Sequence, residues 1–232
     1  QRLEPPSAQN WFGKDHFGRD VYARAIFGSR LSLIVGGSVS IITLLAGTVI
    51  GLVAGYFRKL DTPVMRVMDG LMSIPGILLA IALMALLGAS LQNVIIALSV
   101  TYTPAVSRLA RSSVLSLRNQ PFVESATAIG ASSLRIILRH ILPNAMAPLI
   151  VQGTFIVASS MLVEAALSFL GAGLPPDIPS WGNMIADGRQ FLRQAVWIIA
   201  FPGVFLTLTV LGVNLVGDGL GDIVDPRLAR RM

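Results

Sequence analysis

Residues 31–57 read LSLIVGGSVSIITLLAGTVIGLVAGYF and carry no charged side chain over 27 positions. A helix of about 20 apolar residues crosses the hydrocarbon core of a bilayer, so this stretch can span a membrane with some tilt. Gly47, Gly51 and Gly55 recur every four residues and therefore share one helix face, where the missing side chains let another helix approach closely. The stretch predicts a transmembrane helix whose glycine face packs on a neighbouring helix, with a substrate-contact face as the alternative.

The composition of the whole chain favours a membrane protein over a water-soluble globule. Of its 232 residues, 53% are hydrophobic and 13% are charged. Soluble domains carry roughly 25% charged residues, about twice as many. The mean hydropathy is +0.71. Because cysteine is absent, disulfides, a thiolate nucleophile and cysteine-ligated metals are excluded.

Four further uncharged stretches extend the predicted topology. They are residues 71–91, 92–107, 145–163 and 194–217. We therefore expect an all-α, polytopic transmembrane bundle with five spans, in which residues 88–90 form a tight turn between the second and third. Residues 1–28 are expected to form an extracytoplasmic segment, 29–218 the transmembrane domain and 219–232 a cytoplasmic tail.

Basic residues in the connections predict the orientation, since Lys and Arg are retained on the cytoplasmic side of a membrane. Eleven of them fall on the side of the 108–143 connection and the C-terminus, against seven on the other side. This difference places the C-terminus in the cytoplasm and Gln1 outside. A chain that starts outside predicts one more helix upstream, so six spans are expected in the full subunit. The net charge of +6 then lies in membrane-flanking loops, which favours lipid headgroups over nucleic acid as its partner.

The connection between the third and fourth spans holds the most informative pattern. Pro121 fits the first position of a helix, and Glu124 lies in its first turn, where the helix dipole favours negative charge. Gly130 is placed to end that helix, because glycine readily adopts the left-handed conformation just past a C-terminus. One face is apolar and comprises Phe122, Ala126 and Ile129. The pattern predicts a short amphipathic helix that a groove on another protein could receive.

A second short helix is expected after the glycine. Ser132 or Ser133 can cap its N-terminus, and Arg135 and Arg139 lie one turn apart along it. We expect this helix to stop before Pro143, because proline cannot donate a helical hydrogen bond. The connection would then turn sharply and lead into the membrane.

The same connection resembles the "EAA" loop of type-1 ABC importer permeases, in which Glu-Ala-Ala is followed by glycine and later by Ile-x-Leu-Pro. Here Ser125 takes the place of the middle alanine, and His140 stands where the general pattern has isoleucine, a His-Ile-Leu-Pro variant shared with peptide-type members. In that family the loop, here residues 119–143, is a coupling helix that docks on an ATP-hydrolysing subunit. The resemblance implies that the coupling residues are Phe122, Glu124, Ser125, Ala126, Ile129, Gly130, Leu142 and Pro143.

Three further segments narrow the resemblance to the C-type permease subunit of the dipeptide/oligopeptide and nickel branch. They are FGRD at 17–20 with GSRLSL at 28–33, LSFLG at 167–171 with PPDIPSWG at 175–182, and NLVGDGL at 214–220 with DPRL at 225–228. Gly221 departs from the arginine common in the family. The resemblance implies a bacterial inner-membrane subunit that pairs with a homologous permease, two ATP-binding subunits and an extracytoplasmic peptide-binding protein.

Other chemistry has little support in the sequence. No G-x-x-x-x-G-K-[S/T] phosphate loop is present, so ATP and Mg²⁺ would be held by the partner ATPases and this chain would bind no cofactor. The two histidines, His16 and His140, are expected on opposite sides of the membrane, which disfavours a metal site. Glu164 is expected near the outer edge of the hydrocarbon core, as an interfacial carboxylate that could line the outer mouth, with a proton relay as the alternative. The polar residues that could line a pathway, or instead pack between helices, are Gln152, Ser159, Glu164 and Asn214.

The expected function is that of a non-catalytic permease subunit of an ATP-driven importer of di- or oligopeptides, forming half of the translocation pathway. Importers of nickel chelates or glutathione-like peptides share these motifs and are the alternative. A stand-alone secondary transporter or channel is the rival from another class. That rival normally needs a deeply buried ionisable site or inverted repeats, and the sequence indicates neither.

Overall fold

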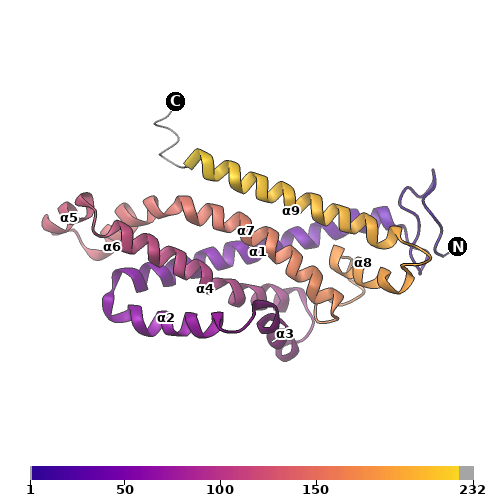
Figure 1. Cartoon of the computed structure of the whole chain (residues 1–232), viewed down its shortest axis with the longest axis horizontal. Coiled ribbons are helices and arrows are strands. Elements are labelled where there is room, and N and C mark those ends of the chain that lie inside the picture. The colour runs from indigo at the N-terminus through magenta and orange to yellow at the C-terminus, as the bar shows by residue number, and fades with distance from the viewer. Residues whose placement is uncertain (1, 225–232) are drawn as a thin grey trace. The chain divides into compact units, whose positions relative to one another are not determined.

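The computed structural model describes residues 2–224, which form helices joined by short connections (Figure 1). The long helices are α1 (Val21–Tyr56), α4 (Leu91–Leu117), α7 (Leu142–Phe169) and α9 (Trp197–Val224). The shorter ones are α2 (Arg58–Met72), α3 (Gly76–Leu87), α5 (Pro121–Ala128), α6 (Ser133–Ile136) and α8 (Trp181–Gly188). A π-helical turn, η1 (Ile137–Ile141), joins α6 to α7, and a 3₁₀ turn, η2 (Arg189–Phe191), follows α8. No strand occurs within residues 2–224, so the expected all-α class is confirmed.

Fewer helices than expected could cross a membrane. Within residues 2–224, three helical runs are long and apolar enough, namely Val21–Tyr56, Ser133–Phe169 and Trp197–Ile223. A fourth crossing requires α2 and α3, which are bent by 89° at their junction, to form one broken span. By length and composition, the described residues thus contain three such runs, or four with the broken span, against the five spans that the sequence predicts. The stretch 71–91 is interrupted, which leaves α3 with 12 residues, and α4 combines Gln92 and Asn93 at its start with Arg108 and Arg111 further on.

The described residues divide into two compact units, each assembled from separate stretches of the chain. Unit 1 contains the residues up to Val39, then Ile77–Leu98 and Ile156–Asn214, and unit 2 contains Ser40–Gly76, Ser99–Phe155 and the residues from Leu215 onward. The boundaries expected at residues 28 and 218 fall inside α1 and α9. The motif at 225–228 and the end of the expected tail lie outside the described residues.

In unit 2, the glycine face of α1 packs directly on α4. A Cβ atom added to Gly51 would collide with the carbonyl oxygen of Ser107 and lie 2.5 Å from the Cβ of Ala110. One added to Gly55 would lie 2.8 Å from the Cβ of Val114. The two helix backbones are therefore in contact along this face, which supports the packing interpretation of the glycine spacing.

Ion pairs hold α2 beside α4 in unit 2 (Figure 1). The guanidinium of Arg111 donates to both carboxylate oxygens of Asp61, at 2.5 and 2.7 Å, and Arg108 donates to Asp69 at 2.6 Å. A bidentate pair fixes orientation as well as distance. Charge pairing along its length makes α2 a helix bound to the side of α4.

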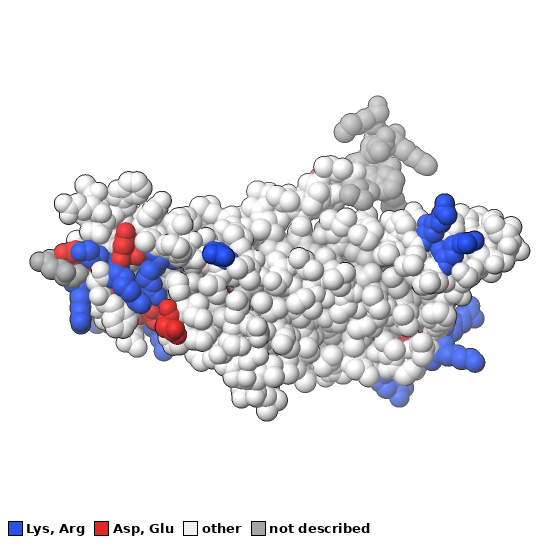
Figure 2. Space-filling view, turned by 180° about the vertical axis from the view of Figure 1, so that it is seen from behind, with Lys and Arg blue, Asp and Glu red and all other residues white. Residues whose placement is uncertain are grey.

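In unit 1, the N-terminal segment is ordered around the carboxylate of Asp15. One oxygen accepts hydrogen bonds from the backbone N–H groups of Phe17 (2.9 Å) and Arg19 (2.8 Å). The other accepts from Arg19 Nε and Arg24 Nη1, both at 2.7 Å. Most of the charged side chains of this unit gather around the segment, and much of the rest of its visible face is uncharged (Figure 2). Asp15 thereby ties the segment to the first turns of α1.

The contacts of Asp15 predict a pH dependence. Burial alone would raise the pKa of Asp15, but hydrogen bonds from Arg19, Arg24 and Phe17 outweigh it and hold the pKa below its ordinary value of 3.8. A lowered folded-state pKa contributes stability above the unfolded value, and this stability is lost as the pH falls through the folded pKa. We expect Asp15→Asn to lower the free energy of unfolding by about 2 kcal/mol at neutral pH.

Thermal melts of the two proteins from neutral pH downward would test this expectation. The difference between wild type and Asp15→Asn should start to shrink once the pH falls below about 4, because the unfolded wild-type chain then binds a proton at Asp15 that the folded protein does not yet bind. A difference that stays constant down to pH values well below about 3 would contradict it.

Candidate functional site

The predicted amphipathic helix is present as α5, which runs from Pro121 to Ala128. Pro121 occupies its first position and Glu124 its first turn, as the sequence predicts. Gly130 has a φ of +81°, so it adopts the left-handed conformation expected of it. The N–H of Gly130 donates to the carbonyl of Thr127, and the N–H of Ala131 donates to that of Ala126, both at 3.0 Å. These two bonds form a Schellman motif that ends the helix sharply.

One face of α5 anchors the helix on the rest of unit 2. Val123 and Ala126 are buried in a hydrophobic cluster with the residues Leu52 of α1, Val114 of α4, and Ile136, Ile137 and Ile141. The spacing of Phe122, Ala126 and Ile129 did not indicate that Val123 and Ala126 anchor the helix. The close spacing of Ile136, Ile137 and Ile141 after the glycine was the available signal, since it predicts a buried helical face.

Another face of α5 borders an open groove of about 570 Å³. Phe122, Ala126 and Ile129 line its apolar side, as their spacing predicts, and the side chains of α6 and η1 that face them are Arg135, Arg139 and His140. Phe122 is 42% exposed and Ile129 is 86% exposed. The groove thus combines large exposed apolar side chains with basic ones, on a helix whose opposite face is buried. These features are typical of a docking surface for another protein. Glu124 and Ser125 are also exposed on α5.

The helix after Gly130 differs from the prediction. Ser132 caps α6 by accepting a hydrogen bond from the N–H of Arg135, at 3.4 Å, as expected. However, the helix does not stop before Pro143, which is instead the second residue of α7. The N–H of Leu142 donates five residues back, to the carbonyl of Ile137, and this π-turn shifts the hydrogen-bond register ahead of the proline. Leu142 packs against the buried cluster, and Pro143 is exposed.

The four pathway candidates are divided between the two units. Gln152 belongs to unit 2, whereas Ser159, Glu164 and Asn214 belong to unit 1. Gln152, Ser159 and Asn214 are half-buried, and a role for them in the pathway stays a prediction. Glu164 is fully buried within the described residues, and a role for it in the pathway also stays a prediction. Its Oε1 accepts hydrogen bonds from the hydroxyls of Ser168 and Ser180, both at 3.0 Å.

Long apolar helices, with a short helix exposed between two of them, are typical of a multi-pass membrane subunit. The chain belongs to the family described as binding-protein-dependent transport system inner membrane component, whose sequence model matches residues 47–230. This confirms the resemblance to ABC importer permeases that the sequence indicated.

Relatives and solved structures agree with this membership. The chain is 53% identical over 231 residues to a probable peptide ABC transporter permease protein of Sinorhizobium fredii, covering 100% of this chain and 79% of the relative. It is 48% identical over 228 residues to the dipeptide transport system permease protein of Alkalihalophilus pseudofirmus, covering 98% and 75%. An inward-facing structure of the MetNI methionine ABC transporter matches with a TM-score of 0.73 at 20% identity, over 88% of this chain and 97% of that one. The last likeness shows a shared fold.

Proposed function

We propose that this chain is the permease subunit of an ATP-driven importer of di- or oligopeptides in a bacterial inner membrane. It forms the translocation pathway together with a homologous permease subunit. Two partner subunits bind ATP and Mg²⁺, and an extracytoplasmic binding protein delivers the peptide. Peptide as the substrate is supported by the activities for which the relatives are named. The observation that carries the coupling role is the open groove beside Phe122 and Ile129.

The packing of α5 suggests how movement of an ATPase would reach the spans. Val123 and Ala126 lock α5 onto Leu52 of α1, Val114 of α4 and Ile141 of the π-turn. Because close-packed interiors are stiff, a push on α5 moves these helix ends as one body. ATP would favour one arrangement of the ATPases, so it would shift the spans toward the conformation that fits that arrangement.

A substitution at the rim of the groove tests the proposal. Ile129→Gln removes an apolar side chain that is exposed in the isolated subunit, so folding should be nearly unaffected. Burying an isoleucine is worth about 2 to 3 kcal/mol, so we expect ATPase binding to weaken at least about tenfold and uptake to fall in proportion. Ala128→Gln is the matched control, because Ala128 is exposed on the same helix but does not line the groove.

The measurements are copurification of the ATPase subunits with the permease and uptake of labelled dialanine into proteoliposomes containing the complete transporter. Normal assembly and uptake by Ile129→Gln would show that the ATPases dock elsewhere. Uptake of glutathione or a nickel chelate in place of dialanine would favour the alternative substrates.

A further inference from the structure

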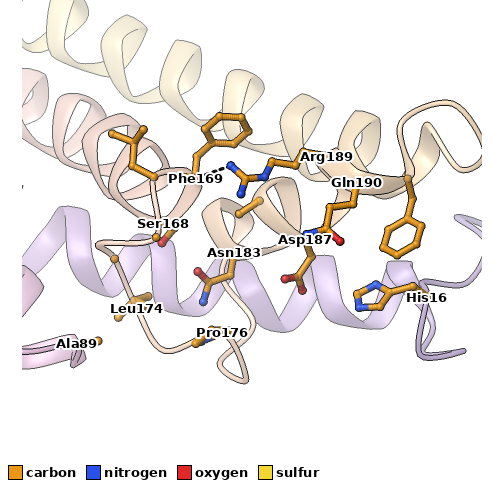
Figure 3. Close-up of a pocket in the computed structure, with 15 residues that line it drawn as sticks. His16, Ala89, Ser168, Phe169, Leu174, Pro176, Asn183, Asp187, Arg189 and Gln190 are labelled. Atoms are coloured by element: carbon orange, nitrogen blue, oxygen red, sulfur yellow. Dashed lines mark hydrogen bonds between the residues drawn. The ribbon is translucent and has the colours of Figure 1, made fainter.

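A cavity of about 330 Å³ lies in unit 1, beside the loop that follows α7 (Figure 3). Its walls come from residues 168–176, from α8 and η2, from His16 of the N-terminal segment and from Ala89 of the turn before α4. The open groove beside α5 belongs to unit 2, so it shares no residue with this cavity. A volume of this size lies within the range of small-molecule sites.

A polar stripe on α8 and η2 faces this cavity (Figure 3). Asn183, Asp187 and Gln190 are four and three residues apart, so they share one helix face. Trp181 and Met184 of the same helix are buried in hydrophobic clusters instead. The apolar side of α8 thus fixes the helix, and its polar side lines the cavity.

The carboxylate of Asp187 is short of hydrogen-bond donors. Among the described residues its closest cationic atoms are Arg24 Nη2, at 3.5 Å, and Arg19 Nη2, at 4.0 Å, and no hydrogen bond to it is formed. Those same arginines donate to Asp15 at 2.7 Å. An ionised carboxylate can accept about four hydrogen bonds, so Asp187 retains capacity for a donor that enters the cavity.

Asn183 adds a second acceptor beside it. Its Nδ2 donates to the carbonyl oxygens of Pro175, at 2.8 Å, and Ile178, at 2.9 Å. Both amide hydrogens are therefore engaged, and this fixes the orientation of the side chain. The Oδ1 of Asn183 is left as the free acceptor of the amide.

Arg189 supplies donors on another wall of the cavity. One of its guanidinium nitrogens donates to the carbonyl oxygen of Phe169 at 3.3 Å, and the guanidinium carbon lies 5.4 Å from the centre of the Phe169 ring. These contacts hold the side chain in place and leave most of its N–H groups unused. Within residues 2–224 no acidic side chain forms an ion pair with Arg189.

We propose that this cavity binds a short peptide, or an amino acid, through both of its charged ends. The ammonium group is bound by Asp187 and by Oδ1 of Asn183, and the carboxylate is bound by Arg189. The positive charges of Arg19, Arg24 and Arg189 repel a simple cation. A ligand that also contains a carboxylate therefore fits this cavity better than an amine alone. The negative charge of Asp187 likewise repels a simple anion. The inference takes its ligand class from the proposed function.

Peptides with blocked ends provide the test. Binding of dialanine, N-acetyl-dialanine and dialanine amide to the complete transporter in nanodiscs, without binding protein, can be followed by saturation-transfer NMR. We expect each blocked peptide to bind at least about tenfold more weakly than dialanine, because each lacks one charge-assisted contact. Asp187→Asn should weaken dialanine about tenfold and leave N-acetyl-dialanine unchanged, and Arg189→Gln should leave dialanine amide unchanged.

Asp177 and Arg193 are exposed charged residues outside the cavity, so their substitutions serve as matched controls. We expect Asp177→Asn and Arg193→Gln to bind dialanine as wild type does. Equal binding of free and blocked peptides to wild type would overturn the inference. If Asp187→Asn still assembles with its ATPases but loses all three peptides equally, this would also overturn it, because Asp187 would then not act on the ammonium group in particular. ATP-driven uptake of dialanine tests the proposed function separately. If the transporter imports dialanine but binds free and blocked peptides equally, the proposed binding site is wrong and the proposed function stands.

Discussion

Gly51→Ala is expected to lower the free energy of unfolding by about 3 kcal/mol, although alanine normally stabilises a helix relative to glycine. The new Cβ would collide with the carbonyl oxygen of Ser107 and lie 2.9 Å from the backbone nitrogen of Arg111. Both are backbone atoms, so no side-chain rotation relieves the overlap, and α4 must move away from α1. Arg111 also carries the bidentate pair to Asp61, so the displacement weakens the attachment of α2.

Gly37→Ala, in the same helix, is the matched control. Among the described residues no atom outside the local helix comes within 4 Å of a Cβ built at Gly37. The substitution should therefore be neutral or stabilise the helix by up to about 1 kcal/mol. Thermal unfolding of both variants in the same detergent measures the difference. Melting temperatures that agree would show that α1 and α4 are not in close contact along the glycine face.

This pair of glycines illustrates what the sequence could and could not predict about the fold. The four-residue spacing of Gly47, Gly51 and Gly55 depends only on helix geometry, so the packing face was predictable. Its partner was not, because the small residues Ser107 and Ala110 of α4 also fit many other helix surfaces. The bend between α2 and α3 was not predictable for a related reason, since an uncharged stretch such as 71–91 can contain a sharp bend between two helices.

The candidate site shows the same division between local and distant interactions. Pro121 and Gly130 act through their own backbone conformations, so the limits of α5 followed from them. Pro143 was misjudged because the rule that proline ends a helix assumes hydrogen bonds four residues apart. The five-residue bond from Leu142 to Ile137 shifts that register. Ile137 and Ile141 are buried in a cluster with Leu52 of α1 and Val114 of α4, and the local sequence does not identify these partners.

Glu164 shows most clearly why counting along a helix is insufficient. Its distance from the start of the span predicts an interfacial carboxylate. That distance does not say whether the side chain points to the surface or into the packed interior, where the structure places it. Ser168, one turn further on, could have been foreseen as a partner. Ser180 could not, because it is 16 residues away and caps α8, where its hydroxyl also accepts from the N–H of Asn183 at 3.1 Å. The carboxyl group thus joins the start of α8 to α7.

From this arrangement we expect Glu164→Leu to be far more damaging than Glu164→Gln. Leucine leaves the buried hydroxyls of Ser168 and Ser180 without their acceptor, at about 1 to 3 kcal/mol for each group, so a loss of roughly 3 kcal/mol is expected. Glutamine keeps an acceptor oxygen of the same reach, so the variant should fold and import peptide nearly as wild type does.

Thermal unfolding and dialanine uptake, measured on both variants, separate a structural carboxyl group from a conducting one. A side chain with no exposed surface that only joins two helices acts through its acceptor atom, which the amide retains. A proton relay acts through an ionisable group, which the amide lacks. If Glu164→Gln folds normally but abolishes uptake, Glu164 carries charge during transport, and its burial describes only one state of the cycle.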